Sequence, residues 1–245
     1  MKTHFYRVRA ITNLHPGSGD ADYGVVDKLV QRDPVTGFPT IYMSAVKGAM
    51  REYFERHSAS SSATEEQKAV TNLSKGTILE IFGSDPKAQS QEVKQGKLRF
   101  VSADLLAIPR MSEDSSSNHA YQLCYVNSLL EDWKAKAALF GIAMGDVAAV
   151  LTANAQKRNE VSMSVFKELC ENLPVVARNY LDNGESKNLW YEEFVPRETV
   201  FGLLVQGPEA LMSVFSGQID GKVIQLGGNA TVGYGYCLFS KMAEA

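Results

Sequence analysis

Two residues near the start of the chain, His15 and Asp27, carry side chains suited to proton transfer. They stand at either end of the segment LHPGSGDADYGVVD, which is rich in glycine and acidic residues. A lone histidine after a strand is more often structural than catalytic, and a lone aspartate in a glycine-rich loop usually caps a turn. No Ser-His-Asp arrangement and no nucleophile elbow accompanies them. His15 and Asp27 are therefore candidates whose chemistry depends on their surroundings.

A second group of polar residues has the spacing of one helix face. Ser44, Lys47 and Arg51 stand at positions i, i+3 and i+7 of a helix predicted from Ser44 to about His57. Ser44 is expected to cap this helix, and the helix N-terminus together with two basic side chains attracts anions. The residues predict either a phosphate-binding edge or a solvated helix face with a cap.

The third candidate is the glycine-rich segment GGNATVGYG near the end of the chain. Gly228 and Gly233 have the spacing of the Walker phosphate loop, but Tyr234 and Gly235 follow where a lysine and a Ser or Thr would be required. The missing lysine therefore argues against a nucleoside triphosphatase. Glycines still let backbone N–H groups approach a phosphate closely, so the segment predicts either an RNA backbone contact or a tight turn.

The composition is that of an ordinary globular protein, with 245 residues, 44% hydrophobic and 22% charged. No apolar run reaches the roughly 20 residues of a membrane-spanning helix, and MKTHFYRVRA lacks the apolar part of a secretory signal. Cys124, Cys170 and Cys237 are widely spaced, which argues against a disulfide framework and a structural zinc site. A cytoplasmic protein is expected. With a net charge of −3, nucleic-acid binding has to rest on local placement of charge.

Periodicity in the first half of the chain predicts the elements that position these residues. HFYRVRAITNL places Tyr6, Val8 and Ala10 on one face of a strand. The predicted helix 44–57 has apolar residues at i, i+3, i+4, i+7 and i+8. TILEIFG and LRFVSADLLAIP read as strands, and the second is expected to end at Pro109.

In the second half, the region from about Tyr125 to Tyr180 has mostly helical patterns. Asn183 and Gly184 predict the turn of a hairpin in DNGESKNLWYEEFV, and a strand, a helix opened by Pro208 and a last strand follow. This order predicts the α+β class, with an antiparallel sheet and helices on one face. A split βαβ (ferredoxin-like) core is one natural way to build it, within a single domain.

Several of these segments together resemble one known family. LHPGSG, YGVVDKLVQRDPVTGFPTIYMSAVKGAMR and LGGNATVGYG are similar to motifs of the RAMP superfamily of CRISPR effector proteins. The closer similarity is to the repeated backbone subunits of the type III-B (Cmr) complex, through VVDxxVQRDxxTGFPxI and SxxKGAMR. LRFVSADLLAIP and NLWYEEFVP also look like segments of that family, so the resemblance spans most of the chain.

The resemblance implies a fold and a set of partners. It implies one RAMP domain over residues 1–245 with an RRM-like (ferredoxin-like) core and insertions at about 58–75 and 111–177. A protruding hairpin at about 178–198, the thumb, would kink the guide–target duplex at every sixth nucleotide. Copies of the chain would form a helical filament along a CRISPR RNA, with target RNA and other effector subunits as further partners and no membrane.

The resemblance also assigns residues to RNA binding. The guide backbone would follow the helix edge, and the terminal glycine loop would make a second contact. The implied RNA-binding residues are Ser44, Lys47, Arg51, Arg32, Gly228, Asn229 and Gly233. The polar loop from His15 to Asp27 would then face the flipped target nucleotide.

The resemblance also implies that Asp27, in GVVD, corresponds to the family's catalytic aspartate. RNA carries its own nucleophile, the 2′-OH, so the protein mainly has to supply in-line geometry and proton transfer. Asp27 could act as general base or could position a divalent ion, Mg²⁺ or Mn²⁺. His15 is its candidate partner, with Tyr191 or Glu192 as further ones. An ordinary aspartate is a weak base at neutral pH, so slow or metal-assisted cleavage is expected.

The sequence departs from the family pattern in two places. IPRMSEDSSS keeps Arg110 but lacks the second half of a PxRS-like segment, and GSGDADYG is one residue longer than the usual loop, which bears on the position of Asp27. Three functions remain open: an RNA-guided endoribonuclease subunit, a structural subunit that assembles the same filament without cutting, and a stand-alone RAMP nuclease that processes the CRISPR precursor. Asp27 favours the RNA-guided endoribonuclease subunit. His15 is compatible with the stand-alone nuclease, but the thumb-like hairpin argues against that function.

Overall fold

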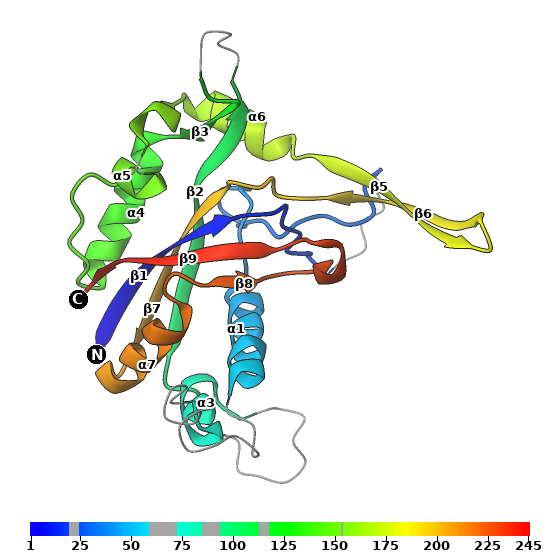
Figure 1. Cartoon of the computed structure of the whole chain (residues 1–245). Coiled ribbons are helices and arrows are strands. Elements are labelled where there is room, and N and C mark those ends of the chain that lie inside the picture. Colours follow the sequence, from blue (N-terminus) through cyan, green and yellow to red (C-terminus); the bar gives the residue numbers. More distant parts are fainter. Residues whose placement is uncertain (20–24, 59–72, 85–93, 113–117, 153) are drawn as a thin grey trace.

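The computed structural model describes residues 1–19, 25–58, 73–84, 94–112, 118–152 and 154–245 (Figure 1). The strands are β1 (Lys2–Ala10), β2 (Arg99–Met111), β3 (Tyr121–Tyr125), β4 (Arg158–Glu160), β5 (Val175–Asp182), β6 (Glu185–Glu193), β7 (Val200–Gly207), β8 (Val223–Gln225) and β9 (Tyr236–Glu244). The helices are α1 (Met43–His57), α3 (Lys75–Phe82), α4 (Asn127–Leu139), α5 (Ala148–Leu151), α6 (Met163–Glu171) and α7 (Glu209–Ile219), with 3₁₀ turns at Ala155–Lys157 and Ala230–Val232.

Seven strands form one sheet in the order β4-β3-β2-β7-β1-β9-β8, and β5 and β6 form a separate hairpin. The central neighbours β2-β7, β7-β1 and β1-β9 are all antiparallel. Along the chain, β1, α1, β2, β7, α7 and β9 follow one another in the β-α-β-β-α-β order of a split βαβ unit. The α+β class predicted from the sequence is confirmed.

The sheet is buried on both faces, not on one as the sequence predicts. Phe5 packs against Trp133 of α4, with ring centroids 4.4 Å apart. Its neighbour Tyr6 points to the opposite face, where it meets Met50 of α1 and Phe215 of α7. Figure 1 shows α4 and α5 on one side of the sheet and α1 and α7 on the other. The helical insertion between β3 and β4 supplies this second layer, because α4 buries its apolar stripe on the strands.

The segment TILEIFG, predicted as a strand, is helix α3. The hydroxyl of Ser74 accepts a hydrogen bond from the backbone N–H of Thr77, and Gly83, at φ 90°, ends the helix. Phe82 then packs edge-on against Phe54 of α1, with centroids 5.2 Å apart. Capping and packing therefore override the strand propensity of the isoleucines.

Two other boundaries differ from the prediction. β2 passes Pro109 and ends at Met111, because its last residues pair with β3. α1 starts at Met43 with Tyr42 as its N-cap residue, so Ser44 lies inside the helix and does not cap it. The predicted helical region 125–180 contains α4, α5 and α6, and in addition β4 and most of β5. Most of the predicted insertion at 58–75 and the lengthened loop around Asp22 lie outside the described residues.

None of the helices in the described ranges is both long and apolar enough to span a membrane.

Candidate functional site

The hairpin β5–β6 projects from the sheet at the position predicted for the thumb (Figure 1). Asn183 and Gly184 have φ values of 51° and 85°, which is the pair of positive angles that a two-residue type I′ turn requires. The base of the hairpin pairs with the segment that carries Asp27: the N–H groups of Asp27 and Lys28 both donate to Tyr191 O, at 3.0 and 3.1 Å, and Glu193 N–H donates to Lys28 O at 2.9 Å. The predicted catalytic aspartate is thus hydrogen-bonded through its backbone to the base of the thumb.

The Asp27 side chain is exposed at this junction. Its Oδ2 accepts a hydrogen bond from the backbone N–H of Tyr191 at 2.7 Å. For the other oxygen, Oδ1, the described part of the chain offers no hydrogen-bond donor. One oxygen is therefore held in place while the other is available for a proton or a cation.

His15 lies close by and is buried. Its Nδ1 is 2.7 Å from the carbonyl oxygen of Glu193, and because a carbonyl can only accept, Nδ1 carries the proton. In the neutral ring Nε2 is then the acceptor. His15 and Asp27 line one cavity together with Gly17, Ser18, Gly19, Lys28 and Leu29. The structure therefore places the two predicted chemical residues at the same site.

A buried carboxylate, that of Glu192, contacts three segments of the chain, one of them through His15 of this cavity. Glu192 is fully buried, and its side chain accepts a hydrogen bond from the Asn229 amide of the glycine loop. Arg178 Nε of β5 is 3.5 Å from Glu192 Oε2, and His15 Nδ1 is 3.8 Å from Glu192 Oε1. The guanidinium of Arg178 in turn lies 4.8 Å from the ring centroid of Tyr234. These contacts fix the first loop, the thumb and the glycine loop relative to one another.

The glycine loop approaches the first loop through its backbone. Gly228 N–H donates to His15 O at 2.9 Å. Gly227 has a φ of 73°, and a Cβ added there would lie 2.5 Å from the same carbonyl oxygen, so only glycine fits. Gly228 and Gly233 are exposed, whereas the amide of Asn229 is engaged by Glu192. The loop therefore presents backbone at its surface and uses its asparagine internally.

The predicted helix edge lies away from this cavity. Arg51 is half-buried, with Nε donating to Glu55 Oε1 at 2.8 Å and a terminal nitrogen donating to Gly83 O at 3.2 Å. Lys47 makes no ion pair with any described residue, and Ser44 is exposed. Of these three residues, none lines the cavity at Asp27.

Arg32 is also committed within the chain. It forms an ion pair with Glu193 at 2.6 Å and donates to the carbonyls of Cys170 and Gly37, at 2.8 and 3.0 Å. These bonds hold the first loop against α6 and the base of the thumb. In the structure the Arg32 guanidinium thus stabilises the packing of the first loop. Its contact with RNA stays a prediction.

The donor set at the cavity is small for a metal ion. In the described ranges, His, Cys, Asp and Glu side chains form no cluster of three or more that could hold one. Glu192 and Glu193 are engaged by Arg178 and Arg32, which leaves the Asp27 carboxylate. Mg²⁺ is often held by one or two carboxylates together with substrate phosphates and water. The site therefore fits a divalent ion only in combination with RNA oxygens.

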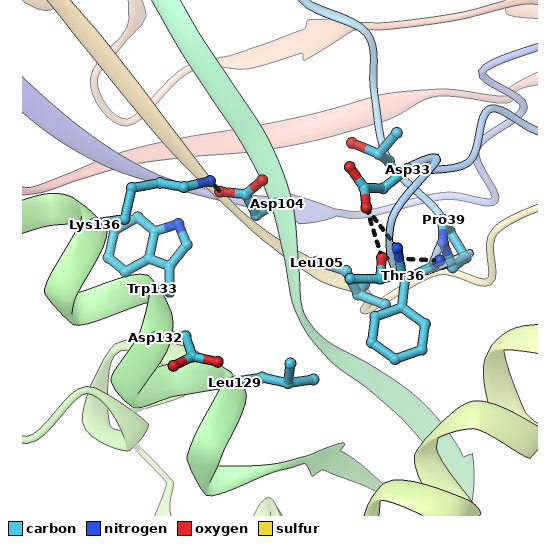
Figure 2. A pocket seen from close by; sticks show the side chains of 11 residues that line it. Asp33, Thr36, Pro39, Asp104, Leu105, Leu129, Asp132, Trp133 and Lys136 are labelled. Carbon is cyan, nitrogen blue, oxygen red and sulfur yellow. Dashed lines mark hydrogen bonds and ion pairs between the residues drawn. The ribbon is translucent and has the colours of Figure 1, made fainter.

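A separate cavity of about 230 Å³ lies between β2, α4 and the turn that follows Asp33 (Figure 2). Its carboxylates are largely satisfied: Asp104 accepts from Lys136 Nζ at 2.7 Å, and Asp33 accepts from the Thr36 N–H and hydroxyl. Burial alone would raise the pKa of Asp33, but the hydrogen bonds from Thr36 outweigh it and the pKa is lowered. None of the residues that the sequence assigns to chemistry or RNA binding lines this cavity.

Two residues of the site, Lys28 and Arg178, have no role in the sequence analysis. Lys28 directly follows Asp27 and could have been found from that adjacency. Arg178 carries no local signal, because its partners Glu192 and Tyr234 come from other segments and meet it only in the folded chain.

Comparisons with known proteins agree with this arrangement. The family model of the RAMP superfamily matches residues 7–238. The CRISPR system Cmr endoribonuclease Cmr4 of Pyrococcus furiosus is 26% identical, in an alignment that covers 96% of this chain and 94% of that protein.

Solved structures share the fold. A cryo-EM structure of the type III-B Cmr-beta complex bound to cognate target RNA contains a chain with a TM-score of 0.75 at 19% identity, with 98% of this chain and 96% of that chain covered. The crystal structure of oligomeric Cmr4 from Pyrococcus furiosus gives a TM-score of 0.68 at 22% identity, with 99% of both chains covered. With a family model that spans nearly its whole length, the chain belongs to the RAMP superfamily.

Proposed function

We propose that the chain is the repeated backbone subunit of an RNA-guided type III-B CRISPR effector, and that it cleaves RNA complementary to the guide at six-nucleotide intervals. The observation that carries the proposal is the Asp27 carboxylate, held at the base of the thumb by the N–H of Tyr191 with its second oxygen available. The similar Pyrococcus furiosus protein is named an endoribonuclease, and it is alignable over nearly its whole length.

In this proposal the thumb supplies geometry and Asp27 supplies proton transfer. The thumb unstacks a target nucleotide, so that its 2′-oxygen can align with the adjacent phosphorus. Asp27 accepts the proton of the 2′-OH, the 2′-oxygen–phosphorus bond forms, and the bond from phosphorus to the 5′-oxygen breaks. The 5′-oxygen takes a proton from water. The products are a 2′,3′-cyclic phosphate and a 5′-OH end.

Metal dependence is part of the proposal. The free oxygen of Asp27 and the phosphate oxygens of the target would hold a divalent ion, Mg²⁺ or Mn²⁺. Such an ion would supply charge neutralisation at the phosphate when it is bound. Because only one oxygen of Asp27 is free, Asp27 would act either as the general base or as the ligand of the ion, and in both cases the contacts of Glu192 hold the neighbouring segments together.

The proposed partners are a CRISPR RNA, a target RNA, further copies of the chain and other Cmr subunits. The relatives support this set: one belongs to a complex described with target RNA, and another crystallised as an oligomer. The proposed location is the cytoplasm, in keeping with three cysteines that are all free and buried.

Cleavage of labelled complementary RNA by the reconstituted, guide-loaded complex tests the proposal. Wild-type complex should give fragments at six-nucleotide steps, and Asp27→Ala should abolish them while target affinity stays within about threefold, since in this proposal the carboxylate acts on the 2′-OH and base pairing supplies the affinity. Parallel reactions with Mg²⁺, Mn²⁺ and EDTA test the ion. Equal cleavage by wild type and Asp27→Ala would move the active site, with His15 next in line. Tight target binding without cleavage would leave a structural subunit.

A further inference from the structure

Lys28 follows Asp27, the proposed general base, in the chain, and its backbone is hydrogen-bonded to the same strand, β6. Its backbone N–H donates to Tyr191 O at 3.1 Å, and its carbonyl accepts from Glu193 N–H at 2.9 Å. The residue therefore adds one position to the edge of β6, and its side chain starts from a fixed point. Lys28 lines the same cavity as Asp27 and His15.

The ammonium group of Lys28 rests on an aromatic ring. Its Nζ is 5.0 Å from the ring centroid of Trp190, within the range of a cation–π contact. Trp190 is half-buried, and its indole nitrogen is buried, so packing holds the ring. Trp190 thus limits the positions that the ammonium can take.

The charge of Lys28 is not used within the described part of the chain. The carboxylates of the residues next to it in the chain and across the pairing have other partners: Asp27 accepts from the Tyr191 N–H with one oxygen, and Glu193 is paired with Arg32. No ion pair involves Lys28 among the described residues. A cation that is held by a ring, and not by a carboxylate, keeps its full charge available to an incoming anion.

We infer that Lys28 contacts the scissile phosphate and stabilises the negative charge that builds up on its non-bridging oxygens, with Trp190 as its positioning residue. The inference rests on the proposed function. During the reaction the proton of the 2′-OH goes to Asp27 and the 5′-oxygen is protonated by water, so Lys28 neither gives nor takes a proton. A fixed cation at this place would neutralise part of the phosphate charge that a divalent ion would otherwise have to neutralise.

Single-turnover cleavage by the assembled, guide-loaded complex tests this role. Lys28→Met keeps the length of the side chain and removes the charge, and Lys28→Arg keeps the charge. We expect Lys28→Met to slow cleavage at saturating target by about 10- to 100-fold, less than the loss of a buried oxyanion-hole donor costs because Lys28 is exposed, while target affinity changes less than about threefold. Lys28→Arg should recover most of the rate. Lys134→Met is the matched control, because Lys134 lies on α4 and pairs with Glu131.

The ring is tested separately. Trp190→Leu should slow cleavage in the same direction as Lys28→Met but less, and Trp190→Phe should stay close to wild type because an aromatic face remains.

The outcomes separate this inference from the proposed function. Two results would overturn the role of Lys28: a wild-type cleavage rate in Lys28→Met, or the same loss of rate and of target affinity in Lys28→Arg as in Lys28→Met. In either case, cleavage by the wild-type complex would still uphold the proposed function. If the wild-type complex cleaves no more target RNA than the Asp27→Ala complex does, both the proposed function and the role of Lys28 would be overturned.

Discussion

Glu192 shows how much of the site depends on one side chain. Its carboxylate has no exposed surface, yet its partners come from β5, from the glycine loop and from the first loop. A buried charge of this kind is stable only while its partners surround it. The neighbouring residue in the chain, Tyr191, holds Asp27. A substitution at Glu192 is therefore expected to alter the position of Asp27, the proposed base, although the two side chains are not in contact.

We expect Glu192→Ala to lower the free energy of unfolding by about 3 kcal/mol, because it leaves the Arg178 guanidinium partly buried without its carboxylate. Urea denaturation of the isolated chain measures the change. Glu185→Ala is the control: Glu185 pairs with Lys187 at the exposed tip of the same hairpin, so the loss there should stay within about 0.5 kcal/mol. Equal stability of both variants would show that the network does not support the fold.

At the scale of elements, the edge of helix α1 that is predicted to bind phosphate differs from the prediction in the side chains it leaves available. The three residues stay on one face, but Ser44 follows the helix start and the Arg51 guanidinium is bound to Glu55 and Gly83. Lys47 keeps its charge free of any ion pair in the described ranges. If this helix follows the guide RNA, Lys47 carries more of the contact than Arg51.

We therefore expect Lys47→Ala to weaken binding of the CRISPR RNA more than Arg51→Ala does. Losing one phosphate contact should reduce the slope of log affinity against log salt by about 0.7 for single-stranded RNA. Titrations of guide RNA at several salt concentrations measure both quantities. Arg56→Ala is the control on the same helix, since Arg56 is exposed and pairs with Glu52. An unchanged slope in Lys47→Ala would contradict the assignment of this helix edge.

At the scale of the whole molecule, the two chain ends meet on adjacent strands. β1 pairs with β9, and Thr3 exchanges hydrogen bonds with Ala245. His4 is buried there, with Nδ1 3.1 Å from the hydroxyl of Tyr6. Burial, followed by the charge of Lys241, lowers the pKa of His4 below its ordinary value, and Lys2 adds to this while Glu244 opposes it. Folding therefore favours the neutral ring.

This burial gives a pH dependence with a definite sign. As the pH falls below about 6.5, the unfolded chain protonates His4 while the folded chain resists it, so the free energy of unfolding decreases. Thermal unfolding between pH 7.5 and 5.5 should show a smaller fall in Tm for His4→Gln than for wild type. His57→Gln, at an exposed position on α1, should behave as wild type does. An identical fall in His4→Gln and wild type would contradict the role of His4.

The sequence alone determined the features that depend on local periodicity and turn chemistry. The alternation in β1, the apolar stripe of α1, the Asn183-Gly184 turn and the α+β order all appear as predicted, because each depends on neighbours within a few residues. The family motifs also singled out Asp27 and the glycine loop, whose roles stay predictions; in the fold both adjoin the segment of His15. TILEIFG is the exception: its isoleucines favour a strand by propensity, whereas the flanking Ser74 and Gly83 cap a helix.

Only the tertiary structure decided which side chains meet. In the thumb, β5 and β6 pair Leu181 with Ser186 but Tyr180 with Asn188, so one extra residue on β6 shifts the register before Glu192 is reached. A shift of one residue moves a side chain to the other face of a hairpin, and here it accompanies the burial of Glu192 beside His15 and Asn229. The second helical layer on α4 was likewise decided by packing. Such contacts join segments far apart in the chain, which no local pattern records.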